Sequence, residues 1–271
     1  MPELPEVETT RRGIRSALRG RRITGMVLRE PRLRWPVDAS LVKSLPGQQV
    51  RDVHRRAKYL LIELERGTLI AHLGMSGSLR VLPPATPLLT HDHYDLVLDS
   101  GKCLRFNDPR RFGSLLWVTG DPEAHALLKD LGPEPLERDF HVDYLARKAR
   151  SRKVAIKQFL MDQRVVVGVG NIYASEALFR AGISPRKAAG RVPRAKLDAL
   201  VVAVRDVLGE AIRQGGTTLR DYVSADGTPG YFRQKLYVYE RSKEPCRRCG
   251  TAVRQIVQGQ RSTYFCPQCQ K

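Results

Sequence analysis

The sequence predicts an α+β protein of several domains: an N-terminal helix with an antiparallel β-sandwich, then a helical domain, then a small four-cysteine zinc finger. Three observations predict this class. Short β-type runs separated by turn residues lie between residues 23 and 118, helical periodicity begins near residue 142, and two Cys-x2-Cys pairs stand near the C-terminus. The 271 residues are enough for two domains with separate cores.

The first half of the chain predicts one helix followed by strands. Val7, Ile14 and Leu18 recur with basic residues between them, and Gly20 ends the pattern, so we expect a helix over residues 5–19. Turn residues separate the apolar runs that follow at intervals typical of an antiparallel sandwich or barrel. The expected strands are residues 23–28, 59–64, 68–73, 94–98 and 114–118, with a proline-rich loop at 83–87.

A hinge and a helical region are expected next. Residues 132–135 read Gly-Pro-Glu-Pro, a sequence typical of a break between domains. Apolar residues at helical spacing then predict four helices, over residues 142–150, 154–162, 172–181 and 194–214. Residues 216–231 follow, polar and rich in glycine, and we expect a loop there.

The charge balance identifies a class of partner. Lys and Arg number 47 against 28 Asp and Glu, a formal net charge of +19, which is typical of proteins that bind a polyanion. No apolar run approaches the roughly 20 residues that span a bilayer. Glu3, Glu6 and Glu8 stand where a signal peptide would need basic residues. We therefore expect a cytoplasmic protein with no membrane association.

The cysteines predict a metal site. Cys246 and Cys249 form one pair, Cys266 and Cys269 the other, and sixteen residues separate the pairs. This spacing is typical of a structural zinc ion held by four thiolates, and a redox pair would need a thioredoxin-like context. Residues 253–257 and 262–265 would form the connecting hairpin, turning at 258–260 with Arg261 near its tip. For Cys103, buried packing is the expected role.

The N-terminus predicts a nucleophile. Removal of Met1 ahead of Pro2 would leave a secondary amine, and α-amino groups have a pKa of about 7.7–8.0 against about 10.4 for lysine. Attack of such an amine on a sugar C1′ gives an iminium ion, an electron sink that favours elimination. Glu3 would then act as a general acid, and Glu6 would orient the amine. Alternatively, Pro2 and Glu3 simply begin a helix, where proline and acids are favoured.

A glycine turn between two expected helices predicts a phosphate site. Gly168 and Gly170 allow backbone amides to approach a ligand, and Asn171 begins the next helix. Lys153 and Lys157, expected on the preceding helix, add positive charge. Such loops are often no more than turns.

Together these pieces resemble the bacterial formamidopyrimidine-DNA glycosylase family. Leu4 favours this family over the related endonuclease VIII, in which glycine commonly stands at that position. The matching segments run in order through the whole chain: residues 2–8, 55–60, 72–77, 91–93, 108–113, 167–176 and the two cysteine pairs.

The resemblance implies a fold and a reaction. The fold would be a β-sandwich domain (residues 2–132), a helix-two-turn-helix DNA-binding domain (133–235) whose loop at 216–231 closes over the extruded base, and a zinc finger (236–271). Such enzymes excise 8-oxoguanine and formamidopyrimidines from double-stranded DNA, and cut abasic sites by β- and δ-elimination. We expect a monomer that is associated with the nucleoid through DNA binding.

The resemblance also assigns roles to single residues. Pro2 would be the Schiff-base nucleophile, Glu3 the proton donor, Lys58 an acid in β-elimination, and Arg261 an acid in the second elimination and a phosphate ligand. Other positions would bind DNA: His72, His91, Arg110, Lys153 and Asn171. Met75, Arg110 and Phe112 would fill the gap left by the extruded nucleotide.

Simpler roles remain open for several of these residues. Met75 and Phe112 fit an ordinary core, Lys58 a solvated charge, and His91 and His93 a pair of surface imidazoles. Two other functions compete: an endonuclease VIII-like glycosylase for oxidised pyrimidines, and a non-catalytic zinc-dependent DNA-binding protein. The latter gains nothing from a free Pro2.

Overall fold

The computed structural model describes residues 2–216 and 235–271. The expected closing loop, apart from Gly216, therefore lies outside the described residues. The described chain divides into two compact units, residues 2–129 with 214–216, and residues 130–213 with 235–271. Within these ranges no helix has the length and apolar character needed to cross a membrane.

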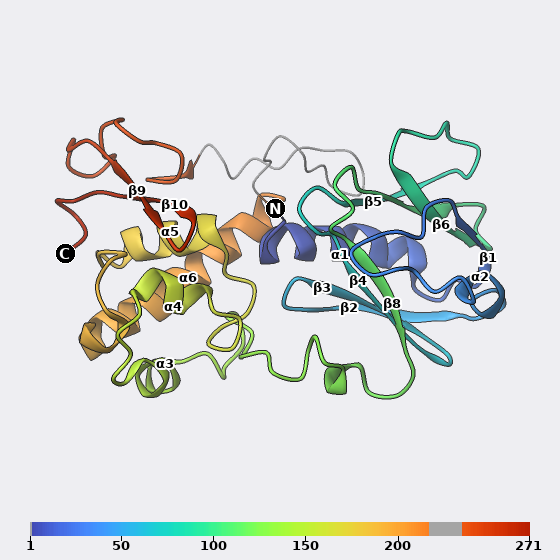
Figure 1. The fold of residues 1–271 in the computed structure, drawn as a ribbon, viewed down its shortest axis with the longest axis horizontal. Coiled ribbons are helices and arrows are strands. Elements are labelled where there is room, and N and C mark those ends of the chain that lie inside the picture. Colours follow the sequence, from blue (N-terminus) through green and yellow to red (C-terminus); the bar gives the residue numbers. More distant parts are fainter. Residues whose placement is uncertain (1, 217–234) are drawn as a thin grey trace. The chain divides into compact units, whose positions relative to one another are not determined.

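The first unit consists of a β-sandwich and one long helix that packs with it (Figure 1). Helix α1 (Leu4–Leu18) is followed by two antiparallel four-stranded sheets, ordered β1-β6-β7-β5 and β2-β3-β4-β8. The first sheet contains β1 (Ile23–Leu28), β5 (Ser78–Leu82), β6 (Asp92–Leu98) and β7 (Cys103–Asn107). The second contains β2 (Val50–Arg56), β3 (Tyr59–Leu64), β4 (Gly67–His72) and β8 (Ser114–Val118), and two short helices lie outside the sheets, α2 (Leu41–Ser44) and η1 (Pro122–Ala124).

Side chains from both sheets meet in one core. Ile62 of β3 and Phe106 of β7 belong to the same buried cluster, and α1 contributes Val7, Ile14 and Leu18 to it. These three positions share a helix face because they are seven and four residues apart. The first unit is therefore a sandwich and not a closed barrel, and the helix that begins at Leu4 is fixed by its core contacts.

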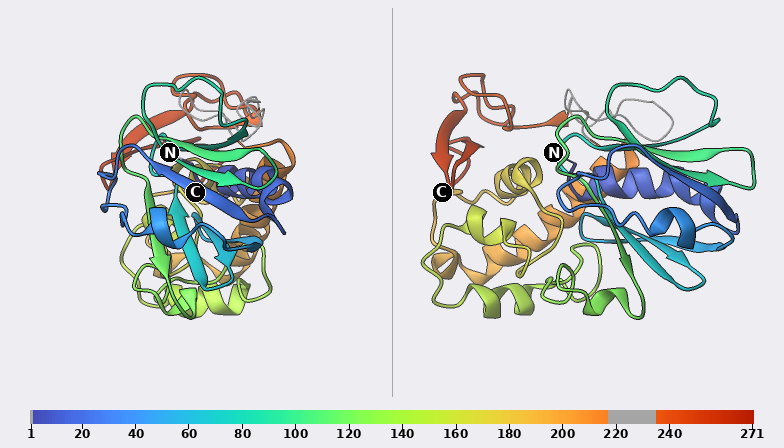
Figure 2. Two further views of the ribbon diagram at one scale, coloured as in Figure 1. Left: turned by 90° about the vertical axis from the view of Figure 1, so that its right-hand side faces the viewer. Right: turned by 45° about the vertical axis from the view of Figure 1, so that its right-hand side comes forward.

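The second unit contains the helices and the C-terminal hairpin (Figure 2). Its main helices are α3 (Val142–Ala149), α4 (Ile156–Met161), α5 (Asn171–Arg180) and α6 (Arg194–Arg213), with one 3-10 turn, η2 (Ala189–Arg191). Strands β9 (Arg254–Gln258) and β10 (Arg261–Phe265) pair in an antiparallel hairpin. The hairpin packs against α5, most of which is buried. The sandwich, the helices and the cysteine hairpin predicted from the sequence are all present.

One placement differs from the sequence-based expectation. Lys153 does not lie on the helix before the glycine turn, because α4 begins only at Ile156. Ser151 adopts a left-handed backbone conformation with φ of 60°, and residues 152–154 run as an irregular connection into the helix. Only Lys157 of the two expected lysines is helical, and it points into the interior with 1% of its surface exposed.

Candidate active site and nucleic-acid interface

The N-terminus of α1 buries the residues expected to perform the chemistry. Glu3 is the N-cap of α1, and Glu6 Oε2 accepts a hydrogen bond from the Glu3 backbone N–H at 2.8 Å. Pro2, Glu3 and Glu6 are all buried. Gly216, with φ of +85°, packs so closely that a Cβ atom there would lie 3.1 Å from Glu6 Oε1. The start of the helix is thus both capped and closely packed around buried carboxylates.

Lys58 lies in the tight turn between β2 and β3, and it is buried rather than solvated. Ala57 adopts φ of 54°, and Arg55 Nη1 donates to the Ala57 carbonyl at 2.8 Å. Arg55 Nε also donates to Glu8 Oε2 at 3.2 Å, which ties this turn to α1. The interpretation of Lys58 as a surface charge is therefore wrong.

His72 lies at the end of β4, beside this turn. Its ring is 4.9 Å from the ring of Tyr59, and its Nδ1 accepts a hydrogen bond from the Gly74 N–H at 2.9 Å. Burial, with a smaller contribution from the charge of Lys58, lowers the pKa of His72 to about 4. At neutral pH His72 is therefore uncharged, with its proton on Nε2, which is a hydrogen-bond donor without a positive charge.

Met75, Arg110 and Phe112 lie on two loops of the sandwich, β4–β5 and β7–β8. Met75 is 37% exposed and Phe112 is 45% exposed, so neither belongs to the core. The Arg110 guanidinium lies 5.1 Å from the centre of the Phe112 ring, a cation–π contact. The alternative of ordinary core packing is wrong for both apolar residues.

His91, which was expected to bind a phosphate, and His93 have different environments. His91 is exposed and has φ of 74°, whereas His93 is buried and its Nε2 donates to the Asp108 carbonyl at 2.7 Å. Only His91 therefore lies at the surface, and the suggestion of two surface imidazoles is wrong for His93.

In the second unit, the side chain of Asn171 at the start of α5 is held at both its oxygen and its nitrogen. Lys157 Nζ donates to Asn171 Oδ1 at 2.6 Å, and Asn171 Nδ2 donates to the Ser262 carbonyl at 3.0 Å. Lys157 Nζ also donates to Thr263 Oγ1 at 2.7 Å. The buried lysine therefore joins the glycine turn to β10, whose first residue is Arg261. Sequence reasoning gave Lys157 only a general contribution to the positive charge.

Lys153 lines a basic pocket of about 430 Å³, together with Arg152, Arg191 and Gly190. In the described part of the chain, the three cationic side chains of this pocket, Arg152, Lys153 and Arg191, form no ion pair with an acidic residue. An unpaired cationic surface of this kind suits a phosphate.

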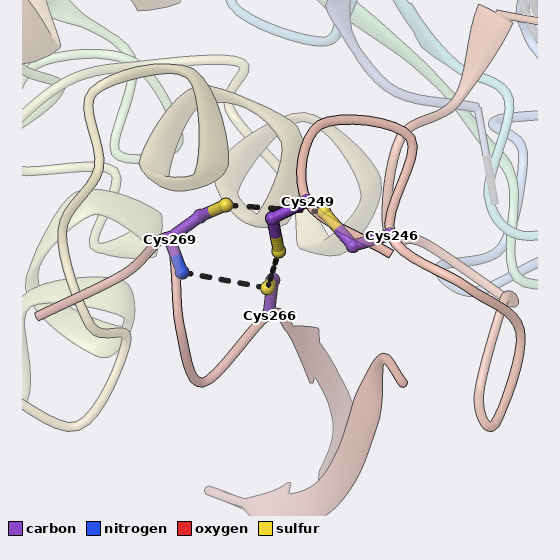
Figure 3. A group of neighbouring side chains, drawn as sticks. All are labelled: Cys246, Cys249, Cys266 and Cys269. Carbon is purple, nitrogen blue, oxygen red and sulfur yellow. Dashed lines mark hydrogen bonds between the residues drawn. The ribbon is translucent and has the colours of Figure 1, made fainter. Parts of the chain in front are cut away.

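The four cysteines form a site that fits zinc (Figure 3). Their sulfur atoms all lie within 4.8 Å of one another, and the Cys249–Cys266 and Cys246–Cys269 sulfurs are 3.5 and 3.9 Å apart. A tetrahedral ion with Zn–S bonds of about 2.3 Å places its sulfurs about 3.8 Å apart. Burial and neighbouring thiols raise the pKa of Cys269 to about 12, so four thiolates require a cation.

Sequence reasoning missed two fully buried charged residues and one partly buried one, although each lies inside a segment quoted for the family resemblance. They are Arg55, Asp108 and Glu176. Glu176 on α5 accepts hydrogen bonds from three successive backbone N–H groups, at 2.8 to 2.9 Å, in the segment that leads to the zinc hairpin. Only Glu176 carried a signal in the sequence, because it stands in a largely apolar stretch (residues 172–179) and a buried charge needs partners.

A sandwich with a buried Pro-Glu terminus, a helical domain with a glycine turn before a buried helix, and a four-cysteine zinc hairpin together define a class of DNA-repair glycosylases. Comparisons with known proteins lead to the same class. Family models match formamidopyrimidine-DNA glycosylase in its N-terminal domain over residues 1–115 and its H2TH domain over 131–223. A zinc finger found in FPG and IleRS matches residues 243–271.

Individual relatives match over the whole chain. Formamidopyrimidine-DNA glycosylase of Thioalkalivibrio sulfidiphilus is 63% identical, and that of Alkalilimnicola ehrlichii 59%, each with full coverage of both chains. The solved complex of Lactococcus lactis Fpg with DNA containing an abasic site has a TM-score of 0.93 at 34% identity and full coverage. MutM (FPG) of Thermus thermophilus has a TM-score of 0.88 at 42% identity, covering 99% of this chain and 98% of its own. This chain belongs to the formamidopyrimidine-DNA glycosylase family.

Proposed function

We propose that this protein removes oxidised purines, 8-oxoguanine and formamidopyrimidines, from double-stranded DNA and then cleaves the strand at the resulting abasic site. Family membership makes it a base-excision repair glycosylase with lyase activity. The observation that supports the substrate is the exposed Met75, Phe112 and Arg110 group on the sandwich. Extruding a base costs a few kcal/mol of lost stacking, and an apolar wedge beside a cation offsets part of that cost.

The chemistry follows from the α1 terminus. The Pro2 nitrogen attacks C1′, the bond to the base breaks, and Glu3 protonates the sugar ring oxygen as the ring opens to an iminium ion. Loss of a proton from C2′ then breaks the C3′–oxygen bond and releases one phosphate. A second elimination breaks the C5′–oxygen bond and releases the other. Lys58 and Arg261 would each supply a proton to a departing phosphate.

DNA binding would draw on both units. His72, His91 and Arg110 belong to the sandwich unit, and Lys153, Asn171 and Arg261 to the helical unit. The zinc ion would be held by Cys246, Cys249, Cys266 and Cys269, and its role would be to fold the hairpin that carries Arg261. We also propose that the enzyme acts as a monomer on the DNA of the bacterial cytoplasm, with domains at residues 2–132, 133–235 and 236–271. The net charge of +19 supports association with nucleoid DNA.

Borohydride trapping tests this proposal. The protein is incubated with a duplex that contains 8-oxoguanine opposite cytosine, reduced, digested and mapped by mass spectrometry. A covalent adduct on Pro2 is expected. Adducts confined to a duplex with an oxidised pyrimidine would favour the endonuclease VIII-like activity. Tight DNA binding without an adduct on either duplex would favour a non-catalytic DNA-binding protein.

A further inference from the structure

Asp108 is a fully buried carboxylate at which two exposed loops meet. Its Oδ1 accepts a hydrogen bond from Ser76 Oγ at 2.8 Å, and Ser76 follows Met75 in the β4–β5 loop. Its Oδ2 accepts from the Gly113 N–H at 2.8 Å, and Oδ1 also accepts from the Arg110 N–H at 3.3 Å. Gly113 and Arg110 flank Phe112 in the β7–β8 loop. One side chain therefore holds the backbone on both sides of the wedge.

The Asp108 backbone joins a third segment to these loops. Its N–H donates to the His91 carbonyl at 3.1 Å, and its carbonyl accepts from His93 Nε2 at 2.7 Å. His91 is the exposed imidazole expected to bind a phosphate. The segments that carry Met75, His91, Arg110 and Phe112 thus all contact Asp108, which is itself buried.

The two loops are also packed without free space. Gly74 has φ of +67°, and a Cβ atom there would lie 2.4 Å from the Gly113 nitrogen and 2.5 Å from the Phe112 carbonyl carbon. Backbone atoms this close cannot move independently. The side chains of Met75 and Phe112 remain exposed above this fixed base. Side chains that are already ordered in the free protein lose less conformational entropy when they enter the DNA duplex.

We propose that Asp108 is a positioning residue that sets the selectivity for the base opposite the lesion, by holding Met75, Arg110 and Phe112 as one preformed wedge. This inference rests on the proposed glycosylase function. A carboxylate suits this position because the three groups around it, two backbone N–H groups and one hydroxyl, all donate hydrogen bonds to it, and a carboxylate only accepts. An asparagine has one acceptor oxygen, and its amide nitrogen would face either the Gly113 N–H or the Ser76 and Arg110 donors, so at least one of the contacts that fix the two loops would be lost.

The experiment compares Asp108→Asn with the unaltered protein in three assays: excision of 8-oxoguanine opposite cytosine, excision opposite adenine, and cleavage of an abasic site in single-stranded DNA. Displacement of catalytic or positioning groups by about 1 Å can cost about a hundredfold in rate, so we expect duplex excision to fall about tenfold to a hundredfold. The cytosine-to-adenine ratio should fall as well. Single-strand cleavage needs no wedge and should keep its rate, per active enzyme counted by borohydride trapping.

Three further variants keep the test decisive if Asp108→Asn folds poorly. Ser76→Ala removes one of the donors and should lower the cytosine-to-adenine ratio partway, while Ser76→Thr keeps the hydroxyl and should restore it. Asp52→Asn removes another partly buried carboxylate of the sandwich, which pairs with Arg15 at 2.6 Å away from both loops. It should leave the ratio unchanged.

The outcomes are separable. An unchanged ratio in Asp108→Asn and Ser76→Ala overturns the positioning role while the glycosylase function stands. Equal losses on duplex and single-stranded DNA also overturn it, since they would show general damage. If the unaltered protein excises no 8-oxoguanine from either duplex, the proposed function fails and the inference fails with it.

Discussion

Arg55 on β2 and Glu8 on α1 form an ion pair with Nε 3.2 Å from Oε2, and this pair joins the first helix to the sheet. Arg11 and Arg12 donate to the same carboxylate at 2.8 Å. Since Arg55 also donates to the Ala57 carbonyl, the position of the Lys58 turn depends on a charge cluster on α1. The helix that follows Pro2 and the turn that carries Lys58 therefore share one anchor.

The Glu8 cluster predicts a dependence of stability on pH. Burial alone would raise the pKa of Glu8, but hydrogen bonds from Arg11 and Arg12 and the charge of Arg55 lower it from 4.5 to about 2. Because the pKa is depressed in the folded state, this stabilisation is complete above about pH 4.5 and is lost as the pH falls towards 2. We expect Glu8→Gln to lower the free energy of unfolding by about 1–3 kcal/mol at pH 7, measured by urea denaturation.

The difference between Glu8→Gln and the unaltered protein should shrink as the pH is lowered from 4.5 towards 2. Glu65→Gln is a suitable control, because Glu65 is an exposed residue that lies 3.8 Å from Arg22. A surface pair of this kind contributes about 0–1 kcal/mol. A difference for Glu8→Gln that stays constant with pH would contradict the assignment.

Glu176 predicts a local effect on the segment before the zinc hairpin. Its Oε1 accepts from the N–H groups of Val238 and Tyr239, and its Oε2 from that of Tyr237. In Glu176→Gln the amide nitrogen would face at least one of these donors, and a buried donor without an acceptor costs about 1–3 kcal/mol. We expect hydrogen exchange of these three amides to accelerate about tenfold or more.

Glu210→Gln provides the matched control for Glu176. Glu210 pairs with Arg180 at 2.8 Å at a partly exposed position, so its loss should leave the exchange of residues 237–239 nearly unchanged. Equal acceleration in both variants would show general loosening of the second unit and would refute the anchoring role of Glu176.

The extent to which the fold was predictable depends on how regular each segment is. Apolar residues at helical spacing placed α6 correctly, and cysteine spacing placed the zinc site. Strand β2 was not predicted because only Val50 and Val53 face its core. They are three residues apart, and a register shift between Val50 and Asp52 allows both to point inward, which breaks the expected alternation.

Buried charges limited the prediction further. Strand β7 contains Arg105, which is 1% exposed and donates to Asp95 with two nitrogens at 2.9 Å. A sequence pattern treats such an arginine as a surface residue, because its neutralising partner lies on another strand. Asp108 was missed for the same reason. The positions of Met75 and Phe112 outside the core likewise depended on contacts between loops far apart in the sequence.

Removing a zinc ligand should unfold the C-terminal hairpin. Cys266→Ser replaces a fully buried thiol, and we expect zinc content to fall from about one ion to well below one, since structural zinc contributes about 10–16 kcal/mol to such folds. DNA affinity should fall because Arg261 leads β10. Atomic absorption and a DNA titration measure the two effects. Cys103→Ala, a buried cysteine of the sandwich, should keep the ion; zinc loss in both variants would contradict the four-ligand assignment.

Extending the N-terminus tests the nucleophile. A protein that retains Met1, or carries one residue added before Pro2, has an amide in place of the prolyl amine, and an amide does not attack C1′. Base release and strand cleavage should both be lost, while DNA binding is kept. Gel assays on 8-oxoguanine and abasic duplexes, with a binding titration, measure the three properties. Full activity of a protein shown by mass spectrometry to retain Met1 would exclude Pro2 as the nucleophile.

Arg110 and Arg111 are adjacent exposed arginines with different surroundings, so they form a matched pair for testing opposite-base selectivity. Arg110 lies over the Phe112 ring, whereas Arg111 Nη1 donates to Glu30 at 3.2 Å. The planar guanidinium presents paired donors that suit the acceptors of an unpaired cytosine. We expect Arg110→Ala to lower the cytosine-to-adenine ratio of single-turnover excision about tenfold, equivalent to about 1.4 kcal/mol. Arg110→Lys keeps the charge without the planar fork, and it should lose most of the ratio too. Arg111→Ala should retain the ratio, and an equal loss there would mean that net charge, not the placement of Arg110 over Phe112, determines selectivity.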